Sequence, residues 1–88
     1  MRYNPQVAIA FFRDAHGGIE PYLELPFAVD IGRKWRFDFA WPEYNLALEC
    51  QGGVFSGGRH VRGASLLKEW EKLNAAAILG WRILYCQP

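Results

Sequence analysis

The chain has 88 residues, of which 51% are hydrophobic and 16% aromatic, and its formal net charge is +1. This length fits a single domain with one core, the aromatic content excludes a disordered segment, and the charge excludes a polybasic protein that binds nucleic acid by bulk charge. Because no apolar run approaches the roughly 20 residues that span a bilayer and no signal-peptide pattern is present, we expect a cytoplasmic protein without a membrane partner.

The first third of the chain predicts a helix followed by an extended strand. Asn4 and Pro5 are typical of a helix start, with Asn as the cap and Pro in the first turn. Gly17-Gly18 predicts the end of that helix. Residues 20–29 are apolar and contain two prolines, which favours an edge strand. A turn is expected at Gly32.

The middle of the chain predicts an antiparallel hairpin. Residues 35–40 alternate, which predicts that the aromatic side chains lie on one face (Trp35, Phe37 and Phe39) and that Arg36 and Asp38 lie on the other. Residues 41–45 predict a turn. Residues 46–51 alternate again, with Glu49 and Gln51 on the face opposite Leu46, Leu48 and Cys50. The two polar faces can therefore point the same way.

The last third predicts a loop, a helix and a strand. Residues 52–63 contain five of the nine glycines, which is typical of a loop. Ser65 predicts the cap of a helix over residues 66–79, and helical spacing predicts its core stripe (Leu66, Trp70, Leu73 and Ala77). Gly80 ends this helix, and residues 81–86 predict a final strand reached by a crossover. The whole order predicts an α/β fold.

Two carboxylates are expected on the same face of the hairpin. Asp38 and Glu49 would repel each other there, and a divalent cation would relieve that repulsion. Mg²⁺ accepts one or two carboxylates together with waters and a phosphate, and it can polarise a phosphodiester and lower the pKa of an attacking water. Gln51 returns to this face, where it would orient the water or contact the phosphate. The alternative is a pair of solvated surface acids.

The spacing of Asp38, ten residues and then Glu49-Cys50-Gln51 resembles the PD-(D/E)XK nuclease superfamily. Residues 33–40, 49–53, 56–63 and 71–74 are similar to small phage- and prophage-encoded nuclease-like proteins of that superfamily, and the similarity covers roughly residues 20–86. It implies a minimal restriction-endonuclease-like core, α-β-β-β-α-β, with a mixed central sheet flanked by helices. Residues 1–88 would form this single domain, in the cytoplasm of a bacterium or a phage-infected host cell.

The resemblance also implies an activity and a metal site. The chain would be a metal-dependent endonuclease of the phage type that hydrolyses DNA phosphodiester bonds and is directed to duplex DNA or to a particular DNA structure. Mg²⁺ (or Mn²⁺) would be held by Asp38, Glu49 and the main-chain carbonyl of Cys50. The superfamily usually has Lys at the position of Gln51 and Pro at the position of Phe37. These two departures favour, as an alternative, a catalytically degenerate nuclease-fold module for DNA binding or assembly. A plain interaction domain with solvated acids is a third interpretation.

Two further catalytic residues follow from the resemblance. Lys72, on the predicted second helix, is the candidate for the positive charge that Gln51 lacks. A third carboxylate is expected early in the chain, where Glu24 is the best match and Glu20 and Asp14 are rivals.

The charged residues are unevenly distributed along the chain. Residues 1–32 contain two basic and four acidic side chains, whereas residues 33–88 contain eight and five. A basic face of this kind suits an anionic partner, although a solvated surface is the alternative. We expect DNA contacts from side chains in the glycine-rich loop (Arg59, His60 and Arg62), together with Arg36 and Lys68. A homodimer would suit so small a core and the cutting of two strands.

The two cysteines, Cys50 and Cys86, form no recognisable zinc spacing with the histidines. Without a secretory signal, we expect two buried thiols rather than a disulfide.

Overall fold

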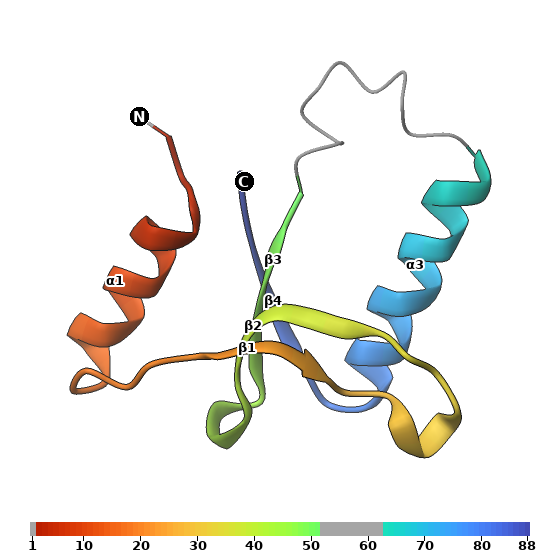
Figure 1. The fold of residues 1–88 in the computed structure, drawn as a ribbon, viewed down its shortest axis with the longest axis horizontal. Helices are drawn as coiled ribbons and strands as arrows, with labels where there is room; N and C mark the ends of the chain where they lie inside the picture. The colour runs from red at the N-terminus through yellow and green to blue at the C-terminus, as the bar shows by residue number, and fades with distance from the viewer. Residues whose placement is uncertain (1, 52–62) are drawn as a thin grey trace.

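The computed structural model describes residues 2–51 and 63–88, and within them a mixed sheet of four strands lies between two helices (Figure 1). In chain order the elements are α1 (Pro5–Ala15), β1 (Tyr22–Pro26), the 3₁₀ turn η1 (Val29–Ile31), β2 (Arg36–Trp41), the 3₁₀ turn η2 (Pro42–Tyr44), β3 (Leu46–Cys50), α3 (Gly63–Ile78) and β4 (Arg82–Cys86). This order confirms the predicted α/β class. None of the helices in these ranges is long and apolar enough to cross a membrane.

The strands lie in the sheet in the order β1-β2-β3-β4. The β1–β2 and β2–β3 pairs are antiparallel, as expected for consecutive strands, and the β3–β4 pair is parallel. The predicted edge position of the first strand and the crossover to the last strand are therefore confirmed. Gln87 N donates a hydrogen bond to Tyr3 O over 2.7 Å, so residues at the two ends of the described chain lie side by side.

Helix α1 begins and ends where its sequence signals predict. The Asn4 side chain accepts a hydrogen bond from Val7 N over 3.1 Å, and Pro5 occupies the first turn. After the helix, Gly17 and Gly18 take positive φ values of 73° and 88°, which cost glycine little.

Helix α3 differs from its prediction in two ways. It begins at Gly63, so Ser65 lies inside the first turn and is not the cap. Ala64 has a high helix propensity, which is compatible with this earlier start. The predicted core stripe is wrong for two of its four members, because Trp70 is 52% exposed and Ala77 is exposed, whereas Leu66 and Leu73 are half-buried. The buried Ala76 and the half-buried Glu69 and Lys72 follow helical spacing instead.

The core has two parts, one on each face of the sheet. The first cluster joins α1 to the sheet and contains Ala8, Ile9, Phe12, Trp41, Leu46, Leu48 and Cys86. The Phe12 and Trp41 rings stack in it at a centroid distance of 4.2 Å. The second cluster joins α3 to the sheet and contains Phe37, Ala40, Ala47 and Ala76. Helices thus cover both faces, which explains why β3 is buried on both sides.

Strand β2 passes from one core cluster to the other. Phe37 belongs to the second cluster while Phe39 packs against the first, so the prediction of one shared aromatic face is wrong. A regular strand would keep residues i and i+2 on one face. The neighbouring strand is irregular at the same level, because Glu24 has a φ of 51°. In Figure 1, β1 and β2 run across the view from the side of α1 to the side of α3.

Candidate active site

The strand register aligns four polar residues in one row across the sheet, and we call Glu24, Asp38, Glu49 and Tyr85 the cross-strand row. Leu23 pairs with Phe39 and Leu25 pairs with Phe37. Glu24 and Asp38 lie between these pairs and are therefore opposite each other. One step beyond the Phe39–Leu48 pair, Asp38 lies opposite Glu49. Glu49 and Tyr85 are direct partners in the parallel β3–β4 pair. The predicted convergence of Asp38 and Glu49 therefore follows from the register.

Asp38 and Glu49 are each fixed by the main chain of the opposite strand. Glu49 Oε2 accepts a hydrogen bond from Asp38 N over 3.0 Å, and Asp38 Oδ2 accepts one from Cys50 N over 2.8 Å. Beyond the Phe39–Leu48 pair, these side-chain bonds replace the main-chain hydrogen bonds that would otherwise join β2 and β3. Both carboxylates are held where the two strands separate.

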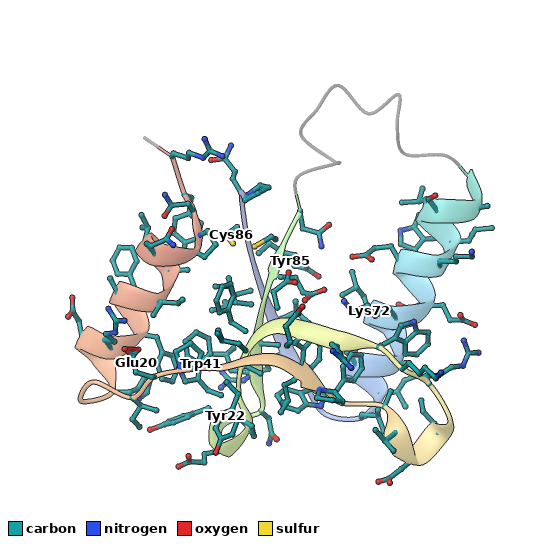
Figure 2. The ribbon with its side chains drawn as sticks, in the orientation of Figure 1. Glu20, Tyr22, Trp41, Lys72, Tyr85 and Cys86 are labelled. Atoms are coloured by element: carbon teal, nitrogen blue, oxygen red, sulfur yellow. The ribbon has the colours of Figure 1, made fainter. Side chains whose placement is uncertain are left out.

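Lys72 reaches this pair from α3, as Figure 2 shows. Its Nζ atom donates to Glu49 Oε1 over 2.5 Å, and the exposed fractions of the two side chains are 17% for Lys72 and 4% for Glu49. The structure thus brings together three candidate residues from separate segments of the chain. Lys68, by contrast, is exposed on α3.

Burial is the main influence on the Glu49 carboxyl. It raises the pKa of Glu49 above its ordinary value, while the hydrogen bonds from Lys72 and from the Asp38 amide act in the opposite direction. The charge of this carboxylate therefore depends on the cation beside it.

Gln51 is held at the same end of the sheet by Glu69, which the sequence does not predict as a site residue. Its Nε2 atom donates to Glu69 Oε2 over 3.0 Å, and its main-chain N donates to Cys86 O over 2.9 Å. The sequence did contain a signal for Glu69, because Glu69, Lys72 and Ala76 have the i, i+3, i+7 spacing of one helix face. Glu69 and Lys72 on α3 thus face Gln51 and Glu49 on the sheet.

Glu24 and Asp38 line the same open pocket. This pocket has a volume of about 340 Å³ and is lined by Pro5, Leu23, Glu24, Asp38, Phe39, Cys50 and Pro88. Within residues 2–51 and 63–88, no group of three or more His, Cys, Asp or Glu side chains is close enough to hold a metal ion. Of the rivals, Glu20 pairs with Arg13 over 2.7 Å on the surface, and Asp14 is exposed on α1.

The predicted DNA-binding residues fall in different places. Arg36 is exposed at the start of β2, where it lines a pocket of about 390 Å³ together with Arg33 and Lys34. Arg33 also pairs with Glu71 of α3 over 3.0 Å. Arg59, His60 and Arg62 lie outside the described residues.

The two cysteines are free thiols next to the carboxylate pair. Cys50 is half-buried and Cys86 buried, and their Sγ atoms are 3.6 Å apart. Burial raises the pKa of Cys50 to about 12. The prediction of a buried thiol is confirmed for Cys86, whereas Cys50 is only half-buried.

Comparison with known proteins gives relatives of unknown activity. No family model and no solved structure matches the chain. Matching relatives are "Uncharacterized protein MT2308" of Mycobacterium tuberculosis strain CDC 1551 / Oshkosh and "Uncharacterized protein Rv2248" of strain ATCC 25618 / H37Rv. Each is 36% identical over 72 residues, which is 78% of this chain but 24% of the relative. The chain therefore spans about a quarter of their length, and the nuclease resemblance stays a prediction.

Proposed function

We propose that this chain is a metal-dependent nuclease that hydrolyses DNA phosphodiester bonds on a restriction-endonuclease-like core. The observation that carries the proposal is the meeting of Asp38 and Glu49 at the separating ends of β2 and β3, with Lys72 bonded to Glu49. Two carboxylates and a lysine at one strand end are the groups that phosphodiester hydrolysis needs: anionic ligands for a cation and a positive charge for the phosphate.

The donor chemistry of the site fits Mg²⁺ or Mn²⁺. Both are hard cations that take oxygen ligands, and Asp38 and Glu49 provide carboxylate oxygens on neighbouring strands. The main-chain carbonyl of Cys50 would complete the protein ligands. When bound, the ion would polarise the phosphodiester and lower the pKa of a water.

The other residues have roles that follow from their contacts. Lys72 supplies positive charge beside Glu49, which Gln51 cannot do, and it balances this carboxylate while no cation is near. Gln51, held by Glu69, orients the water or contacts the phosphate. Glu24 is the further acid beside Asp38 on the open pocket.

Basic side chains near the second pocket support DNA as the substrate. Arg33, Lys34 and Arg36 line that pocket, and arginine can bind a phosphate group with two hydrogen bonds. Lys68 is exposed on α3 and can add a further backbone contact. Arg59, His60 and Arg62 complete the predicted DNA-binding set.

One observation favours a second candidate, a nuclease-fold module that binds DNA or assembles, for example as a homodimer, without catalysis. Glu49 is only 3% exposed and already accepts hydrogen bonds from Lys72 and from Asp38 N. A carboxylate whose oxygens already accept these hydrogen bonds is stable without a metal ion. In this case the acid pair and Lys72 are a structural ion-pair network.

A cleavage assay on duplex, nicked, branched and single-stranded DNA with Mg²⁺ or Mn²⁺ tests the proposal. We expect Asp38→Asn and Glu49→Gln to lower the rate at least about 100-fold, more than the loss of a group that only supports a metal ligand. Glu43→Gln, which changes an exposed acid in η2, is the matched control. Activity that survives both site substitutions would refute the site.

Two further measurements separate the candidates. Lys72→Ala should lower turnover far more than Lys68→Ala, and equal effects would contradict the role of Lys72. Titration calorimetry with Mg²⁺ and Mn²⁺ should detect binding that Asp38→Asn removes, whereas a degenerate module would bind neither ion.

A further inference from the structure

Tyr85 is the member of the cross-strand row that the proposed chemistry does not use. It is the direct partner of Glu49 in the parallel β3–β4 pair, so their side chains lie on the same face of the sheet, about 5 Å apart at Cβ. Their environments differ sharply, because Glu49 is 3% exposed and Tyr85 is 46% exposed. A large aromatic ring thus remains accessible beside a buried charged pair.

The face on which Tyr85 lies is fixed by its neighbours on β4. Ile83 packs against the cluster that contains Ala76 of α3, whereas Cys86 belongs to the cluster on the α1 side. Alternation along the strand therefore places Tyr85 with Ile83, on the α3 side. Lys72 bonds Glu49 from this same side. In Figure 2, the labelled Tyr85 and Lys72 lie in the region between β3 and α3.

Tyr85 lies on an edge strand of the sheet, and its side chain is 46% exposed. Strand β4 is at the edge of the sheet, so no strand within the described residues lies on its outer side. A nucleotide has two parts, a flat base and an anionic phosphate. The exposed ring suits the base, and Lys72, together with a cation held by the two carboxylates, would hold the phosphate. Aromatic side chains stack on bases of any sequence, and each such contact contributes strongly to binding of single strands.

The geometry limits which nucleic acid can use this contact. In a regular duplex both faces of each base are covered by stacked neighbours, so a side chain beside the phosphate finds no free base face. A base becomes available when it is single-stranded, unpaired or turned out of the stack.

We propose that Tyr85 stacks on an unpaired base next to the phosphate that Lys72, together with the cation held by Asp38 and Glu49, would bind. The substrate is then a single strand, or a junction with unpaired nucleotides, rather than a regular duplex. This inference rests on the proposed nuclease function and adds the class of substrate to it.

The test compares Tyr85→Ala, Tyr85→Phe and the matched control Tyr22→Ala. Tyr22 is 58% exposed on the opposite edge strand, where it pairs with Ala40, outside the row. Binding of a fluorescent oligothymidine and of a blunt duplex is measured with Ca²⁺, and cleavage of both is measured with Mg²⁺. Circular dichroism and the unfolding midpoint confirm that each variant is folded.

We expect Tyr85→Ala to weaken oligothymidine binding about tenfold and to leave duplex binding unchanged. Tyr85→Phe keeps the ring and should bind like the wild type, as should Tyr22→Ala. Equal losses for oligothymidine and duplex, or binding by Tyr85→Ala that equals that of Tyr22→Ala, would overturn the inference.

Failure of the nuclease proposal has a different signature. A wild-type protein that cleaves neither substrate, but whose oligothymidine binding still depends on Tyr85, would overturn the catalysis and support the base contact. A wild-type protein that binds neither substrate would overturn both.

Discussion

Replacing Lys72 with Met tests whether the charge of Glu49 depends on its partner. The substitution keeps most of the side-chain volume but removes the ammonium group that bonds Glu49 Oε1. Because the exposed fractions are only 4% for Glu49 and 17% for Lys72, the carboxylate left behind would be a buried, uncompensated charge. Breaking such a pair typically destabilises a protein by about 3–5 kcal/mol, and we expect about 3 kcal/mol here because Lys72 keeps some contact with solvent.

The loss of stability caused by Lys72→Met should depend on pH in a defined direction. Burial raises the pKa of Glu49 in the folded state above its ordinary value of 4.5. At a pH between the pKa of Glu49 in the unfolded state and its higher pKa in the folded state, the folded state holds a proton that the unfolded state has released. The free energy of unfolding therefore falls as the pH rises through this window. Without Lys72 the folded pKa of Glu49 is higher still, and the window extends further upward. The cost of Lys72→Met should therefore be small near pH 4.5 and largest near pH 8.

Urea unfolding followed by tryptophan fluorescence at pH 4.5, 6 and 8 measures this dependence. Lys68→Met, at an exposed position on the same helix, should change stability by less than about 0.5 kcal/mol at every pH. Adding Glu49→Gln to Lys72→Met should recover much of the loss at pH 8, because the buried charge is then gone. A cost for Lys72→Met that is the same at all three pH values, or equal to that of Lys68→Met, would refute the reasoning.

Three further predictions concern the fold and the thiols. Phe37→Ala should lower the free energy of unfolding by about 3–4 kcal/mol, because Phe37 is fully buried and stacks on Phe27 at 3.9 Å; a loss below 1 kcal/mol in urea unfolding would contradict this packing. Asn4→Ala should cost about 1 kcal/mol in the same assay, since it removes the cap bond to Val7 N, and no change would mean that the cap is not formed. The native Cys50 thiol should react very slowly with iodoacetamide at pH 8, because a pKa of about 12 leaves roughly one thiolate in ten thousand; mass spectrometry showing rapid alkylation would exclude this environment.

The sequence signals that acted locally predicted the fold well. The Asn4-Pro5 start of α1, the strand alternation and the closing glycines each depend on a few adjacent residues, and each element lies close to its predicted place. The prediction of which face a side chain lies on was wrong where contacts between distant segments determine that face. Alternation alone could not show that β2 passes from the first core cluster to the second between Phe39 and Phe37.

The candidate site was predictable to a similar degree. The spacing of Asp38 and Glu49 in a hairpin was enough to place them opposite each other. The face of α3 that meets the sheet was not predictable from hydrophobicity, because Glu69 and Lys72 are polar and yet half-buried against polar partners. Tyr85 could not be placed beside Glu49 from the sequence, since the register of a parallel pair depends on the whole crossover.

The passage of β2 between the two clusters has a consequence for cooperativity. Asp38 lies on the strand segment between Phe39, which packs on the α1 side, and Phe37, which packs on the α3 side. Loosening of either layer would therefore shift Asp38 relative to Cys50 N and Glu49, and so separate the carboxylates. We therefore expect local opening of either layer to break the acid pair, so that the site and both halves of the core are lost together.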